Sequence, residues 1–194
     1  MGALVGTRNT QKTVRGQYLH MALGNPLQSV RAFIRYSLLG QLRSPRDRVG
    51  DVIITDTGQS FTVYRETTVQ LSNPEQTREG AVLVFQFHLW FMPDMLAPVV
   101  TRIFEPLSII TTPFFVGLSG FRTKLWLFDR ETGDYEGIYL WESAVAAEQY
   151  ATALRRAMKV FARPGSISYK IVPDTNLDSY LADRTLGDER RCGD

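Results

Sequence analysis

Three side chains that can bind or transform a small molecule alternate along one short stretch of the chain, namely Gln86, His88 and Trp90. They belong to residues 81–91, and the residues that separate them, Phe87 and Leu89, are apolar. Side chains of a β-strand alternate between its two faces, so this pattern predicts a strand with one apolar face and one mixed face. An imidazole titrates near neutral pH and an indole offers a flat apolar surface, so the mixed face is typical of a ligand cavity lining.

The elements that must position these side chains follow the same strand in a regular order. Alternating or β-rich runs predict strands, and apolar residues three to four positions apart predict helices. The predicted strands are residues 81–91, 121–128, 137–142 and 166–172, and the predicted helices are residues 94–113 and a helix capped by Ser143 that ends at residues 163–165. The order β-α-β-β-α-β predicts a ferredoxin-like α+β fold, in which both helices cover one face of a four-stranded antiparallel sheet.

The residues before this unit predict an appended helix and hairpin. Apolar residues at helical spacing predict a helix over about residues 27–42, and two β-rich runs predict a hairpin over about residues 51–69. We therefore divide the chain into an N-terminal extension (1–75), a ferredoxin-like domain (76–175) and a charged C-terminal tail (176–194).

The second face of the predicted four-stranded sheet has no helix to cover it. We assign to this face the apolar side chains Val82, Val84, Trp90, Trp126, Tyr139 and Trp141. An exposed patch of this kind is a liability for a monomer, so we expect a homodimer whose two sheets face each other around a cavity. The polar side chains that would point toward this cavity or its rim are Gln86, His88, Arg122, Lys124, Ser168 and Lys170.

Several segments of the predicted domain match the pattern of a known family. They are Gln86-Phe-His88-Leu-Trp-Phe91, Gly120-Phe-Arg-Thr-Lys124-Leu-Trp126 and Gly137-Ile-Tyr-Leu140, with Ala147 and Tyr150 in the following helix. In these segments the chain resembles the small YdhR-type mono-oxygenases of the dimeric α/β-barrel superfamily. The resemblance covers about residues 80–175 and implies a homodimer whose two sheets form a barrel with the helices outside.

The resemblance implies a cofactor-independent mono-oxygenase acting on a small aromatic or phenolic compound. Such an enzyme removes a proton from its substrate, so that the substrate anion can pass an electron to dioxygen. His88 is the catalytic candidate, as the base. The substrate-binding candidates are Gln86, Trp90, Arg122, Lys124, Trp126, Tyr139 and Trp141, whose rings could hold a planar compound and whose cations could stabilise an anion.

Less specific roles for these residues stay open. His88 could be a hydrogen-bonded residue at a dimer seam, the tryptophans could be interface packing, and Lys124 could pair with Glu142. The alternative function is non-catalytic binding of a small molecule in the same cavity, or of haem with His88 as the iron ligand. No other cofactor is expected.

Composition excludes several classes of partner and site. The 22 basic and 20 acidic residues of the 194-residue chain are spread along it, which does not favour a nucleic-acid-binding protein. With Cys192 as the single cysteine and only two histidines, at positions 20 and 88, neither a disulfide nor a metal site is expected. Charges and prolines within residues 95–118 argue against a membrane span. We expect a cytoplasmic protein without a membrane partner.

Overall fold

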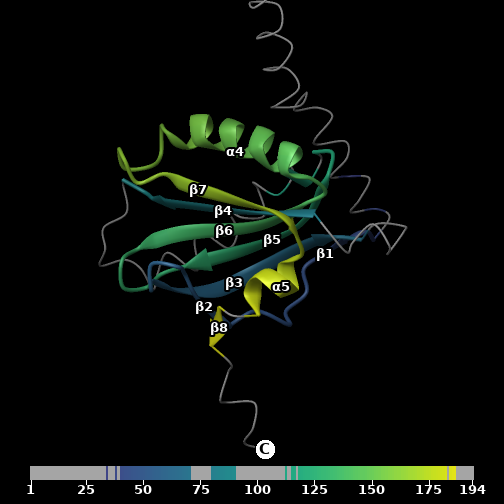
Figure 1. Cartoon of the computed structure of the whole chain (residues 1–194), viewed down its shortest axis with the longest axis horizontal. Helices are drawn as coiled ribbons and strands as arrows, with labels where there is room; N and C mark the ends of the chain where they lie inside the picture. Colours follow the sequence, from purple (N-terminus) through teal and green to yellow (C-terminus); the bar gives the residue numbers. More distant parts are fainter. Residues whose placement is uncertain are drawn as a thin grey trace, which may run out of the picture.

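The computed structural model describes residues 34, 38, 40–70, 80–90, 112, 115–116, 118–182 and 184–186. One antiparallel sheet of eight strands organises them, in the order β7-β4-β6-β5-β3-β2-β8, with β1 also paired to β3 (Figure 1). The strands are β1 (Leu42–Arg43), β2 (Val52–Ile54), β3 (Ser60–Val69), β4 (Gly80–His88), β5 (Phe121–Phe128), β6 (Asp134–Trp141), β7 (Ser168–Thr175) and β8 (Thr185–Leu186).

The four strands β7, β4, β6 and β5 have the order of a ferredoxin-like unit, and the predicted α+β fold class is confirmed. Helix α4 (Ala144–Met158) lies along β4 and β7 in Figure 1. It begins after Ser143, whose side chain accepts a hydrogen bond from the Ala146 amide as an N-cap. The predicted helix over residues 94–113 and most of the one over residues 27–42 lie outside the described residues.

The hairpin before the ferredoxin-like unit extends the same sheet. β3 pairs with β5 from Thr62 opposite Phe128 to Thr68 opposite Thr123, and β2 pairs with β3. β5, which would be an edge strand in an isolated ferredoxin-like unit, is therefore an inner strand here. The residues of β3 suit this position because β-branched and aromatic side chains fit a pleated, half-buried surface.

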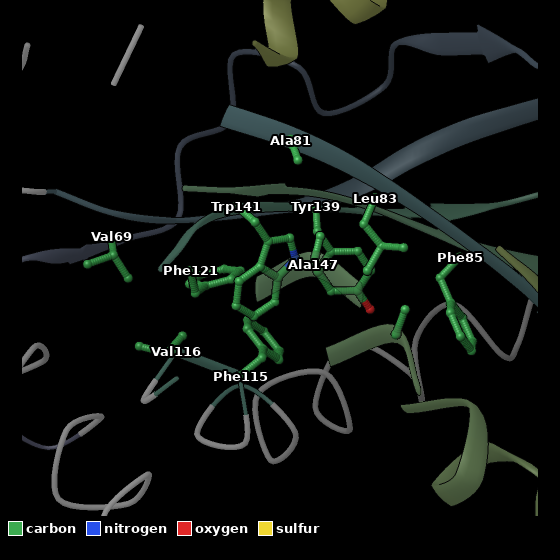
Figure 2. Packing of buried hydrophobic residues seen from close by; sticks show 11 residues of the cluster. Val69, Ala81, Leu83, Phe85, Phe115, Val116, Phe121, Tyr139, Trp141 and Ala147 are labelled. Carbon is green, nitrogen blue, oxygen red and sulfur yellow. The ribbon is translucent and has the colours of Figure 1, made fainter. Parts of the chain in front are cut away.

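The sheet has two apolar faces, each with its own core. Residues directly opposite each other on paired strands share a face. On one face, hereafter the helix face, the core residues are Val69, Ala81, Leu83, Phe85, Phe115, Val116, Phe121, Tyr139, Trp141, Ala147 and Ala151 (Figure 2). On the other, hereafter the second face, they are Ile53, Phe61, Val63, Val82, Leu125, Leu127, Ile138, Leu140, Leu177 and Leu181.

The C-terminal segment of the same chain covers part of the second face. Helix α5 (Leu177–Leu181), capped by Asn176, buries Leu177 and Leu181 in the second core, and β8 then pairs with β2. The described part of the expected tail is thus structured and packed on its own sheet. We expected a partner subunit to bury the second face, and α5 of the same chain buries part of it. The homodimer stays a prediction.

The prediction that Trp126, Tyr139 and Trp141 share a face with Val82 is wrong. Tyr139 and Trp141 lie in the helix-face core with Trp126 packed against it, whereas Val82 lies in the second core. Alternation assigns faces within one strand but does not relate one strand to the next. The pairing register between strands decides which residues share a face: Leu83 lies opposite Tyr139, and Ala81 lies opposite Trp141.

Within the described residues, the helices are too short and too polar to cross a membrane.

Candidate functional site

The most unusual polar group on the helix face is the amine of Lys124. Its side chain is only 6% exposed, and its Nζ atom lies 3.0 Å from the ring centroid of Trp126, 4.7 Å from that of Tyr139 and 4.8 Å from that of Phe115. We call these three rings the aromatic box. No described carboxylate forms an ion pair with Lys124, so the expected alternative of a pair with Glu142 does not occur.

A β-bulge places Lys124 in the box. The pairing of β5 with β6 shifts register between Phe121 and Thr123, and Arg122 is the extra residue. Phe121 and Lys124 are an odd number of positions apart and would lie on opposite faces of a regular strand. The bulge brings both to the helix face, Phe121 opposite Trp141 and Lys124 opposite Tyr139.

The environment of Lys124 favours its neutral form. Burial lowers the pKa of Lys124 well below its ordinary value, and the positive charge of Arg65 lowers it further. The π-faces of the box attract the protonated form and so act against this shift. A lysine whose pKa is lowered in this way accepts a proton from a substrate more readily than a charged, exposed lysine does.

Further polar groups surround the box on the helix face. The Trp126 indole donates to the Thr67 hydroxyl at 3.3 Å, whereas the buried Trp141 indole N–H has no hydrogen-bond partner. The ring of Tyr150, from α4, lies 5.2 Å from that of Tyr139 and 4.9 Å from that of Trp141. Burial raises the pKa of both tyrosines, so their phenols stay protonated as hydrogen-bond donors.

Figure 2 shows the side chains of Leu83, Tyr139 and Trp141 extending from the sheet to the same side, toward Phe115 and Ala147. The region therefore combines flat apolar surfaces, an amine poised to accept a proton and an indole N–H without an acceptor. This set can hold a planar ring and bind an oxygen atom attached to it.

His88 lies on the other side of the sheet, at the end of β4. Its Nδ1 atom is 2.9 Å from Oδ1 of Asp134, directly opposite on β6. The Oδ2 atom of the same carboxylate accepts hydrogen bonds from Gln59 at 2.8 Å and from Gln86 at 3.4 Å. We call these four residues the strand-end network. The network holds the imidazole by a hydrogen bond, which is one of the alternative roles expected for His88. It lies on the opposite face of the sheet from the aromatic box.

The second face also carries a buried carboxyl group that the sequence analysis did not single out. Glu136 is only 5% exposed, lies opposite Gln86 and Leu127, and has no hydrogen-bond partner among the described residues. Burial, with the negative charge of Asp56, raises the pKa of Glu136 to about 7. The sequence could have indicated this position, because Glu136 alternates with Ile138 and Leu140 and so shares their face. That inference needs a strand that starts at Asp134, as β6 does.

The remaining predicted site residues lie apart from both groups. Trp90 is 64% exposed beyond the end of β4, where its indole donates to the Val160 carbonyl at 3.2 Å. Arg122 is buried at the bulge; burial lowers its pKa and Glu142 opposes this shift. Of the predicted set, the structure thus brings together Lys124, Trp126, Tyr139 and Trp141, and separately Gln86 and His88.

Two members of the aromatic surroundings were not in the predicted set. Phe115 falls in the link after the first predicted helix, and no spacing pattern connects it to a strand. Tyr150 belongs to the apolar stripe of α4, a pattern that indicates packing and not a site. Among the described residues, no group of three or more His, Cys, Asp or Glu side chains could hold a metal ion.

Comparison with known proteins gives a fold likeness only. No protein-family model matches the chain, and no curated protein is significantly similar to it in sequence. A Listeria monocytogenes ferredoxin-fold protein related to antibiotic biosynthesis monooxygenases is similar over 62% of this chain and 67% of its own, at 14% identity and a TM-score of 0.40.

Two other solved structures are similar to a comparable degree. A haem-degrading enzyme from Listeria monocytogenes is 12% identical over 74% of this chain and 92% of its own, with a TM-score of 0.40. A monooxygenase-like protein from Listeria innocua is 12% identical over 73% of this chain and 86% of its own, with a TM-score of 0.39.

Proposed function

We propose that the protein binds a small planar phenol or enol against the helix face and removes its proton with Lys124, as the first step of a cofactor-independent mono-oxygenation. The observation that carries this proposal is the Lys124 amine, buried within three aromatic rings and without a carboxylate partner among the described residues. Aromatic rings are the surfaces on which a planar compound binds, and the amine beside them would meet its acidic hydroxyl.

Lys124 suits this step better than His88. A general base must reach the proton that it abstracts, inside a site from which water is largely excluded. His88 lies on the second face, and its Nδ1 atom is engaged by Asp134 at 2.9 Å. Lys124 is surrounded by rings, and once protonated its ammonium would be stabilised by their π-faces.

The chemistry balances without a bound cofactor when the substrate carries an enolisable CH₂ group. Lys124 takes one proton, and the resulting anion passes one electron to dioxygen. The two radicals combine into a carbon–oxygen bond, and the peroxide then loses water to leave a carbonyl group. One oxygen atom enters the product and the other leaves as water, with the Lys124 proton returned during peroxide breakdown. The Trp141 indole N–H, which has no protein acceptor, is available to the anionic oxygen.

Oxygen uptake with anthrone, a planar tricyclic compound with an enolisable carbon, tests the proposal. Lys124→Met should lower the turnover above the enzyme-free rate at least about 100-fold, the lower end of the range for general-base loss. Lys124→Arg introduces a permanently protonated guanidinium that cannot accept a proton, and should be equally inactive. Wild-type protein without turnover for anthrone and for a panel of planar phenols would refute the catalytic proposal, as would an active Lys124→Met.

Binding without turnover is the alternative, with haem as one candidate ligand. Nδ1 of His88 is bonded to Asp134 at 2.9 Å, and iron would be bound through Nε2, an arrangement common among metal-binding histidines. Haem would supply redox chemistry when bound. Added haem should then give a shifted Soret band that disappears in His88→Ala and persists in Lys124→Met. No shift in the wild type excludes this alternative.

The homodimer expected from the sequence is also kept as a proposal. Among the described residues, β7 pairs only with β4, so its outer edge is open to a second chain. Light scattering of the purified protein decides between one chain and two.

A further inference from the structure

Three large apolar side chains are exposed together where β4 ends beside the turn after α4. Trp90, Val160 and Phe161 are 64%, 71% and 51% exposed. The backbone holds them together, because the Trp90 amide donates to the Phe161 carbonyl at 3.2 Å and the Trp90 indole donates to the Val160 carbonyl at 3.2 Å. We call these three residues the apolar tip. Exposed clusters of this kind mark interaction sites more often than scattered single residues do.

The charged residues of the sequence segment that carries Val160 and Phe161 are all basic. Between Glu148 and Asp174 the sequence contains five basic residues and no acidic one. Lys170 is paired with Asp56 at 2.7 Å, but the other four form no ion pair with any residue that the structure describes. These four are Arg155, Arg156, Lys159 and Arg163, and all are exposed. Lys159 and Arg163 directly flank the segment that carries Val160 and Phe161.

We propose that the apolar tip and its four unpaired cations dock the protein on an anionic phospholipid surface. Apolar side chains on a turn can enter the boundary between headgroups and acyl chains, while basic side chains around them meet lipid phosphates. The indole of Trp90 suits this boundary because its N–H is already bonded to the protein and its ring faces outward. The contact lies on the surface and is compatible with the absence of a spanning helix among the described residues.

An anionic lipid fits this tip better than a nucleic acid does. Nucleic-acid sites combine cations with rings on which bases stack, whereas here an aliphatic side chain, Val160, is the most exposed of the three. The proposal does not depend on the aromatic box, because Lys124 lies in the helix-face core. Lys124→Met should therefore bind vesicles like the wild type.

Co-sedimentation of the full chain with lipid vesicles tests the proposal. We expect binding to vesicles of phosphatidylcholine mixed with phosphatidylglycerol, at least about tenfold weaker binding to phosphatidylcholine alone, and weakening at high salt. Val160→Ser/Phe161→Ser and Lys159→Glu/Arg163→Glu should each reduce binding at least about tenfold. Val145→Ser is the matched control, since Val145 is 67% exposed at the opposite end of α4 and should not matter.

Tryptophan fluorescence gives a second readout at the tip itself. The chain has three tryptophans, and of these Trp90 is exposed whereas Trp126 and Trp141 pack on the helix face. Anionic vesicles should shift the emission to shorter wavelength, and Trp90→Phe should abolish the shift while the protein still sediments. Equal binding to both vesicle types, or none, would overturn the proposal. So would a dimer that Val160→Ser/Phe161→Ser dissociates, or oligonucleotide binding in place of vesicle binding.

Discussion

The Nζ atom of Lys124 lies 3.0 Å from the ring centroid of Trp126, and the guanidinium carbon of Arg65 lies 5.9 Å from the same centroid. Two basic side chains thus share one indole, of which Lys124 is buried and Arg65 is half-buried. Lys124 is buried, and Arg65 adds a positive charge that makes a second one unfavourable. Burial and the charge of Arg65 both lower the pKa of Lys124, with burial as the larger cause, so both favour the form of the amine that can accept a proton.

The stability of the protein should report the neutral state of Lys124. The folded-state pKa is lowered, so between that value and the ordinary 10.5 the unfolded chain binds a proton that the folded chain does not. The free energy of unfolding should therefore rise with pH across this window. Urea unfolding at neutral and at alkaline pH measures the rise, and Lys124→Met should remove it. A wild-type curve without this rise would show that the amine is charged in the folded state.

Glu136 should give a pH dependence of the opposite sign. Between pH 4.5 and about 7 the unfolded chain loses a proton that the folded chain keeps, so the free energy of unfolding falls as pH rises. The loss is complete above about pH 7 and is on the order of 3 kcal/mol. Glu136→Gln should flatten this part of the profile and be more stable than the wild type at pH 8. Equal stability of the two proteins at pH 8 would contradict the buried, unpaired state of Glu136.

Gly137 sets the position of the Tyr139 ring. A Cβ atom at this glycine would lie 2.6 Å from Cε2 and 2.9 Å from the hydroxyl oxygen of Tyr139, so the ring must move. Gly137→Ala should destabilise the fold by about 1–3 kcal/mol, as overpacking usually does. It should also weaken binding of a planar phenol, measured by quenching of Trp126 and Trp141 fluorescence. Unchanged binding would mean that Tyr139 is not part of the site.

Removing the carboxylate of Asp134 should separate the strand-end network from the aromatic box. Asp134→Ala leaves the partly buried Gln59, Gln86 and His88 without their common acceptor, which should cost about 1–3 kcal/mol of stability. Turnover that depends on Lys124 should stay within about twofold of the wild type, because the network lies on the other face. A large loss of turnover with intact folding would move the active site to the second face.

Periodicity was sufficient for the elements of the ferredoxin-like unit that the structure describes. The strand predicted over residues 121–128 has those bounds, and Ser143 caps α4 as predicted. Patterns of this kind depend only on residues that are close together in the sequence. The C-terminal helix α5 was missed because its five residues are too short for a helical pattern, and only Leu177 and Leu181 mark its buried side.

The composition of the site was harder to predict, for two physical reasons. The face on which Lys124 lies depends on the bulge between Phe121 and Thr123, and one extra residue in a strand leaves no signal in its own alternation. The relation between Gln86 and Tyr139 depends on strand register, which is set by contacts between segments far apart in sequence. The residues named from the pattern therefore included Lys124, Trp126 and Tyr139 but not Phe115, and they were grouped with His88.

The continuous sheet has a consequence for how the protein is made. β3 is synthesised before β5, its neighbour in the sheet, and the whole of β4 is translated between them. The nascent hairpin thus presents an open backbone edge until its partner has been synthesised, a state in which strands pair with other chains. Productive expression should then depend on chaperone supply or on slow translation, more than it does for ferredoxin-like proteins without the hairpin.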